Sequence, residues 1–189
     1  MSDMSAAVPP GWDENPTAWP KRLRIAALAF TGLCVSAYLT LYQLGAISSV
    51  WDPFFAHGSV AVLNWTHPFP DAALGVLAYA AELALTFIGG PDRWRTLPWT
   101  VLAFGAVILS GAIASVALVI IQLVAVGDWC TLCLTSAALW LIILPLGVGE
   151  PLAGLQHLAR IRAEGGSVWR ALWGRADRPP GVRALEASR

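Results

Sequence analysis

Four long apolar segments dominate the pattern of hydrophobic and polar residues along this chain. They run from Ile25 to Ile47, Ala72 to Gly90, Trp99 to Val126 and Trp129 to Val148, and Glu82 is their only charged residue. A helix that crosses a bilayer needs about 17–25 mostly apolar residues. None of the segments alternates like a barrel strand, and a helix satisfies its own backbone polar groups in lipid. The pattern predicts an all-α integral membrane protein: a four-helix transmembrane bundle with an outer loop between helices 1 and 2.

Composition supports a membrane protein and excludes two other classes. Of the 189 residues, 57% are hydrophobic and only 13% are charged, whereas an ordinary soluble domain has about 25% charged residues. A disordered chain would need low hydrophobicity, but the mean hydropathy is +0.62. The net charge is zero, so we expect no nucleic-acid partner.

The basic residues predict the orientation. The 12 Lys and Arg residues all fall on one side of a four-span arrangement, at Lys21, Arg22, Arg24, Arg93, Arg95, Arg160, Arg162, Arg170, Arg175, Arg178, Arg183 and Arg189. The other side, residues 48–71 and 127–128, carries Asp52, Asp71 and Asp128 but no Lys or Arg. Because basic residues stay on the cytoplasmic side, we expect both termini to be cytoplasmic.

The chain divides into three parts. Residues 1–22 carry four prolines and two tryptophans and are expected to form a flexible cytosolic arm. Residues 23–150 hold the four predicted spans. In residues 151–189, Leu and Ile recur at helical spacing among Arg residues. This basic cytosolic tail is expected either to form an amphipathic helix on the inner leaflet or to be solvated.

A Cys-x-x-Cys pair begins the fourth segment on the outer side. We expect Gly127 to end the third helix and Asp128 to cap the fourth. Cys130 and Cys133 then share one helix face, with depths that differ by about 4.5 Å. The shallower Cys130 is expected to meet a soluble partner, and the deeper Cys133 a molecule dissolved in lipid.

This pair is suited to redox chemistry. Amides at a helix N-terminus stabilise a thiolate, and a neighbouring thiol resolves a mixed disulfide, although Asp128 opposes thiolate formation. The alternative is that both cysteines are merely small apolar residues. A zinc site needs about four ligands, so we expect no metal. Cys34, within the first segment, is expected to pack as a small hydrophobe.

Two acidic residues are further candidates. Glu82 lies inside the second segment, where a carboxylate is costly and is often functional. It is expected to relay protons, to hydrogen-bond a neighbouring helix or to pack in the neutral form. Asp71 immediately precedes the second segment, where it either caps the helix or contacts a quinone head group.

The sequence Trp129-Cys130-Thr131-Leu132-Cys133-Leu134 resembles the active-site motif of the vitamin K epoxide reductase family. Three further segments are similar to bacterial members of that family, and they are residues 36–42, residues 62–64 and residues 71–79. Their order and spacing fit over roughly residues 23–150. The resemblance implies a four-helix core with the Cys-x-x-Cys pair at the outer start of the last helix.

The resemblance also implies electron flow from protein thiols to a membrane quinone. It assigns the reaction with ubiquinone or menaquinone to Cys133 and thiol exchange to Cys130. Asp71 stands at the position where some relatives have an Asn near the quinone carbonyl. Two features depart from the family. Ala137 stands where some relatives have a Tyr, and residues 48–71 contain no cysteine. Ser59 occupies about the place of a loop cysteine.

Two functions follow from these observations. The first is a thiol-disulfide oxidoreductase of the bacterial inner membrane, which passes electrons from a periplasmic thioredoxin-like protein through Cys130 and Cys133 to a quinone and so supports disulfide formation. Without loop cysteines, that protein would have to exchange directly with Cys130. The second is a non-catalytic membrane scaffold or partner-binding protein of the same fold. A transporter or channel would rest on Glu82 alone.

Overall fold

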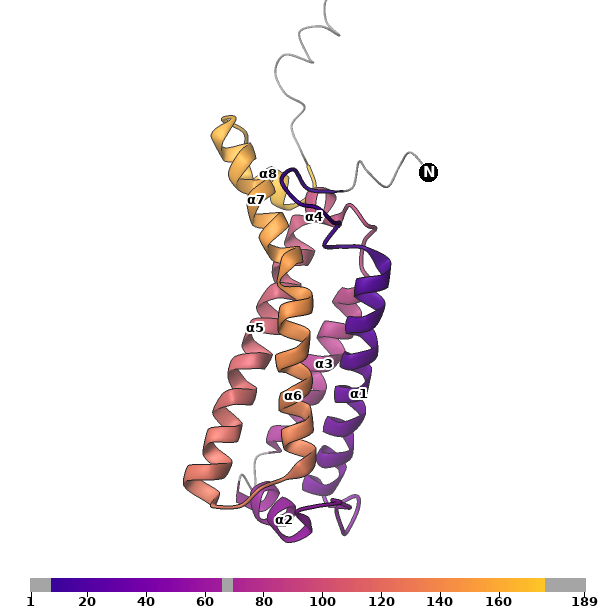
Figure 1. Ribbon diagram of the computed structural model, residues 1–189, viewed down its shortest axis with the longest axis vertical. Coiled ribbons are helices and arrows are strands. Elements are labelled where there is room, and N and C mark those ends of the chain that lie inside the picture. Colours follow the sequence, from indigo (N-terminus) through magenta and orange to yellow (C-terminus); the bar gives the residue numbers. More distant parts are fainter. Residues whose placement is uncertain (1–7, 66–69, 176–189) are drawn as a thin grey trace, which may run out of the picture.

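The computed structural model describes residues 8–65 and 70–175 of the chain. Every regular element within these residues is a helix. Four long helices run side by side along the molecule (Figure 1): α1 (Trp19–Gln43), α3 (Asp71–Phe87), α5 (Pro98–Ile121) and α6 (Thr131–Gly147). The long helices match the four apolar segments of the sequence.

Shorter elements cover the two ends of this bundle. The helix α2 (Ala56–Trp65) lies at one end, called the α2 end below, where a π-helix, η2 (Gln122–Val126), also extends α5. At the opposite end, the α4 end, lie α4 (Arg93–Thr96), α7 (Gly149–Ala163) and α8 (Val168–Leu172). The expected outer loop between the first two long helices therefore contains a helix of its own.

Aromatic packing holds the middle of the bundle together. The rings of Tyr79 on α3 and Trp140 on α6 stack with their centroids 4.5 Å apart and their planes 20° apart. Gly111 lets α5 approach this pair closely, because a Cβ at this glycine would lie 2.6 Å from the Trp140 ring. Close helix contact through small residues is typical of membrane bundles.

Two helix ends differ from the predictions. The first long helix ends at Gln43 rather than Ile47, because Gly45 has a left-handed φ of 72° that stops a helix. Gly127 ends the third helix as predicted, with a φ of 75°. The predicted cap of the fourth helix is wrong: Cys130, not Asp128, occupies the N-cap position and accepts a hydrogen bond there.

Three helices are long and apolar enough to cross a membrane. They span Trp19–Gln43, Pro98–Val126 and Thr131–Ala163, counted over the residues that the structure describes. The last includes α6 and α7, and Figure 1 shows α7 continuing in the direction of α6 beyond the bundle. The chain is an all-helical membrane protein.

Buried arginines close the α4 end. Arg22 is completely buried and donates to the carbonyl oxygens of Thr86 (2.7 Å) and Gly89 (2.9 Å), at the end of α3. Arg93 is also completely buried and pairs with Glu150 of α7. Because the last carbonyls of a helix lack partners within the helix, cations at this position stabilise it.

Part of the expected N-terminal arm contacts α7. Trp12 donates from Nε1 to Oε1 of Gln156 at 2.7 Å, and Gln156 donates back to the carbonyl of Pro10 at 3.0 Å. Thr17 is completely buried. Residues 1–7 and 176–189 lie outside the described residues, and the division of the chain at residues 22 and 150 stays a prediction.

Candidate active site

The two cysteines of the Cys-x-x-Cys pair contact each other at the start of α6. Cys130 has an extended backbone, with φ −121° and ψ 115°, and its Sγ accepts the backbone N–H of Cys133 at 3.2 Å. The Cys133 thiol also donates a hydrogen bond to Cys130. Both cysteines are free thiols. One helical turn thus brings Cys133 against the Cys130 sulfur, the arrangement that intramolecular exchange requires.

Asp52 joins the segment before α2 to the start of α6. Its carboxylate accepts the backbone N–H of Thr131 at 2.8 Å and the Thr131 hydroxyl at 2.5 Å. It also accepts the hydroxyl of Ser59 on α2. Burial alone would raise the pKa of Asp52, but hydrogen bonds from Ser59, Thr131 and two backbone amides hold the pKa below the ordinary range of an aspartate. Asp52 is therefore an anion at neutral pH.

The environment of Cys130 favours its thiolate. Its pKa is lowered to about 7, mainly by the hydrogen bond from the Cys133 thiol. The Ser59 hydroxyl and the backbone N–H of Cys133 lower the pKa further. Burial and the negative charge of Asp52 act in the opposite direction and raise it. The opposition to the thiolate that was expected from Asp128 comes instead from Asp52, and it is outweighed.

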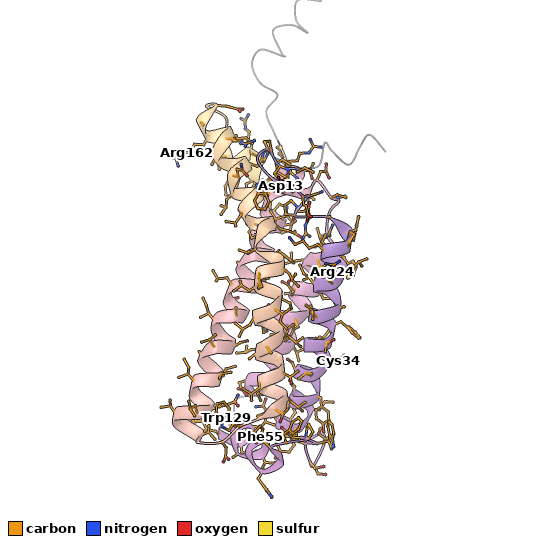
Figure 2. All side chains as sticks on the ribbon, in the orientation of Figure 1. Asp13, Arg24, Cys34, Phe55, Trp129 and Arg162 are labelled. Carbon is orange, nitrogen blue, oxygen red and sulfur yellow. The ribbon has the colours of Figure 1, made fainter. Side chains whose placement is uncertain are left out.

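Cys130 is completely buried, contrary to the expectation that it can meet a soluble partner directly. The helix α2 packs tightly over the residue before it, because a Cβ at Gly58 would collide with the carbonyl oxygen of Trp129. Figure 2 shows Trp129 and Phe55 both at the α2 end. A protein partner can reach Cys130 only after residues 52–65, called the covering segment below, have moved.

Cys133 faces a different environment. It lines a cavity of about 450 Å³, together with Asp71 at the start of α3, Gln122 of η2 and Trp140 of α6. The cavity lies among the four long helices and is lined mainly by apolar residues. A pocket of this size and character is typical of sites for small apolar molecules with a few polar groups. The two cysteines therefore differ in access, because Cys130 is buried and Cys133 lines the cavity.

Comparison with known proteins identifies the chain's relatives. The model of the vitamin K epoxide reductase family matches residues 23–148, about two thirds of the sequence. The chain belongs to this family. No curated protein matches it. Membership implies a membrane thiol oxidoreductase type of activity, and the family in general works with a quinone or vitamin K and with thioredoxin-like partners.

Ser59 lies beside Cys130, although the family resemblance places a loop cysteine at about this position. Its hydroxyl donates its single hydrogen to Asp52, and it lies close enough to Cys130 to contribute to the lowered pKa of that thiol. In this chain the covering segment is therefore connected to the start of α6 by hydrogen bonds, whereas a loop cysteine could exchange disulfides with the pair. The sequence pointed to Ser59 but not to Asp52 as a residue of the site. The one feature that could have indicated Asp52 is that an acidic residue stands seven positions before Ser59, in a segment without basic residues.

Asp71 lies in the first turn of α3 and lines the cavity, but it does not cap the helix. Pro70 occupies the N-cap position, and no side chain caps it. The Asp71 carboxylate instead accepts Nε2 of Gln43 at 2.5 Å, which ties the start of α3 to the end of α1. Ala137, where some relatives have a Tyr, is buried and also lines the cavity.

The remaining candidates lie away from the cysteine pair. Glu82 is completely buried, and among the described residues neither carboxylate oxygen has a hydrogen-bond partner. Cys34 is exposed partway along α1 (Figure 2), so its expected packing in the interior is wrong. The described part of the chain contains no group of three or more metal-binding side chains.

Proposed function

We propose that this protein is a thiol-disulfide oxidoreductase of the bacterial inner membrane, which passes electrons from a periplasmic thioredoxin-like protein through Cys130 and Cys133 to a membrane quinone. The observation that carries the proposal is the unequal setting of the pair. Cys133 lines the cavity among the long helices, and Cys130 lies in contact with it under the covering segment. The pair thus joins a site for an apolar molecule to the end that faces a soluble partner.

The membrane arrangement supports this path. A span needs about 17–25 residues, and α3, with 17 residues, is just long enough. Together with the three longer helices it makes four spans. The basic residues of the described chain lie on α4, α7 and α8, in the first turns of α1 and just after α8, all toward the α4 end. By the positive-inside rule the α4 end and both termini are cytoplasmic. The cysteine pair then faces the periplasm, where thiols are oxidised.

The first half-reaction is thiol-disulfide exchange. A thiolate of the partner attacks the sulfur of Cys130 in the Cys130–Cys133 disulfide, and the Cys133 thiolate leaves. The second thiol of the partner then attacks the mixed disulfide, so that the partner is oxidised and Cys130 leaves as a thiolate. The lowered pKa of Cys130, about 7, makes it a good leaving group, because a thiol with a lower pKa leaves faster.

The second half-reaction reduces the quinone. The Cys133 thiol adds to a quinone in the cavity and transfers its proton to a quinone oxygen. The Cys130 thiolate then attacks the sulfur of Cys133, the disulfide forms again, and the electron pair leaves with the hydroquinone, which takes a second proton from the medium. Two electrons and two protons leave the dithiol, and the quinone gains the same number.

Quinone reduction by a small dithiol tests this function. Purified protein in lipid should reduce decylubiquinone or menadione in the presence of dithiothreitol. Cys133→Ala should abolish turnover because no second cysteine pair exists in the chain, whereas Cys34→Ala should leave the rate close to wild type. Equal activity of Cys133→Ala and the wild type would exclude the proposed path.

The alternative is a non-catalytic scaffold or partner-binding protein. Two observations favour it: Cys130 is completely buried, and residues 48–71 contain no cysteine. A Cys133→Ser variant distinguishes the two functions, because loss of the resolving thiol traps a mixed disulfide between Cys130 and a periplasmic thiol protein. The oxidoreductase predicts this adduct. Its absence, while Cys130 still reacts with small thiol reagents, would favour the scaffold.

A further inference from the structure

Gln122 connects the cavity to the backbone of Cys130. It is the first residue of η2, has 3% of its surface exposed and lines the cavity beside Cys133. Its Oε1 accepts the backbone N–H of Cys130 at 3.1 Å. The π-helical turn is itself notable, because single π-helical turns in membrane and soluble helices often occur at functional sites.

The orientation of the Gln122 amide follows from this contact. A backbone N–H can only donate a hydrogen bond, so the atom that faces Cys130 must be the oxygen of the amide. The amide nitrogen, with its two hydrogens, therefore points elsewhere. Among the residues that the structure describes, no atom accepts a hydrogen bond from this nitrogen. Gln122 thus brings an unused donor to a mainly apolar cavity.

We propose that Gln122 binds the quinone, by donating a hydrogen bond from Nε2 to one of its carbonyl oxygens. This inference rests on the proposed function. Quinone oxygens only accept hydrogen bonds, and Asp71, which also lines the cavity, uses Oδ1 to accept from Gln43. Because negative charge develops on the carbonyl oxygen during reduction, a donor fixed in this position binds the transition state more strongly than the ground state.

Gln122→Glu separates the two contacts of this side chain. Glutamate keeps an oxygen for the backbone N–H of Cys130 and has nearly the same shape. It lacks the two hydrogens of Nε2, so an ionised carboxylate cannot donate to the quinone. A protonated carboxyl can donate again. Gln122→Leu removes both contacts, and Thr135→Val, at an exposed position on α6 outside the cavity, is the matched control.

Quinone binding is measured on the oxidised protein, in which the disulfide prevents turnover. Decylubiquinone is titrated while tryptophan fluorescence is recorded, since Trp140 lines the cavity. At about pH 10, where a buried glutamate is ionised, Gln122→Glu and Gln122→Leu should bind about threefold to tenfold more weakly than wild type, as expected for one lost neutral hydrogen bond. Thr135→Val should bind as the wild type does.

The pH dependence of binding is specific to the proposed contact. As the pH falls from about 10 to about 6, a range that spans the raised pKa of a buried carboxyl, Gln122→Glu should recover most of the lost affinity, and Gln122→Leu should not. Asp52 and Asp71 act electrostatically on the neighbouring Cys133, and they and every other titratable group of the chain are shared by all variants. The ratio to wild type at each pH therefore reports Gln122 alone.

The outcomes separate this inference from the proposed function. If the wild type binds and reduces quinone but Gln122→Glu and Gln122→Leu bind it as well as the wild type, Gln122 does not contact the quinone. If the affinity of Gln122→Glu stays low at every pH, Gln122 acts only on the local structure. If the wild type neither binds nor reduces quinone, the proposed function fails, and this inference fails with it.

Discussion

Thr131, the first residue of α6, donates both its backbone N–H and its hydroxyl to the carboxylate of Asp52, at 2.8 and 2.5 Å. Through Ser59, the same carboxylate also holds α2. One buried anion therefore fixes the covering segment to the helix that carries the cysteine pair. Since Cys130 is completely buried beneath this segment, the strength of the Asp52 contacts controls how often Cys130 becomes accessible.

Asp52→Asn should make Cys130 more accessible. The amide keeps one acceptor oxygen but loses the charge, and a hydrogen bond to a charged group contributes about 1.5–3 kcal/mol. We expect the limiting alkylation rate of Cys130, measured by mass spectrometry well above its pKa, to rise more than tenfold. Asp13→Asn, at an exposed position at the α4 end (Figure 2), is the matched control. An unchanged rate would show that Asp52 does not hold the segment closed.

Ser59→Ala should raise the pKa of Cys130. The hydroxyl of Ser59 is one of the groups that lower this pKa to about 7, so its removal leaves the thiolate with fewer donors. The midpoint of the pH profile for alkylation of Cys130 should lie near pH 7 in the wild type and at a higher pH in the variant. Because Ser59 also holds the covering segment through Asp52, the midpoint of the profile, and not the rate at one pH, is the readout. A midpoint that does not move would exclude the Ser59 contact.

Glu82 and Glu150 should respond in opposite ways to substitution. Glu82 is completely buried and has no hydrogen-bond partner among the described residues, so Glu82→Met should raise the thermal midpoint by removing an unsatisfied polar group. Glu150 pairs with the buried Arg93, and Glu150→Gln should destabilise the protein, by about 3–5 kcal/mol if the pair is fully broken. Quinone turnover should persist in Glu82→Met. If turnover is lost while the fold is retained, Glu82 has a role in the reaction, such as proton relay.

The proposed orientation can be measured with single cysteines. Asn64 on α2 and Arg162 on α7 are both exposed, and each can be replaced by Cys in a chain whose three native cysteines are changed to Ala. In intact spheroplasts, a membrane-impermeant maleimide should label Asn64→Cys but not Arg162→Cys. Lysis should expose both. Labelling of Arg162→Cys before lysis would overturn the cytoplasmic placement of the termini and, with it, a periplasmic cysteine pair.

Much of the bundle could be predicted from the sequence because a membrane helix depends on local properties. The apolar segments around Cys34, Glu82, Gly111 and Trp140 became α1, α3, α5 and α6, since length and apolar composition suffice to define such helices. Their ends were less accurate. The cap at Cys130 was missed because it depends on a sulfur accepting the Cys133 N–H, whereas Asp128 is the usual type of capping residue.

The sequence by itself determined the membrane class, the cysteine pair and the one-sided distribution of basic residues, because these depend on composition and on neighbours in the chain. Only the tertiary structure decided that Cys130 is buried, that Asp52 and Ser59 hold α2 against it, and that Gln122 reaches both its backbone and the cavity. These contacts join residues that are separated in the sequence and are brought together only when the helices pack. Their geometry, and with it the reactivity of the thiols, therefore belongs to the fold.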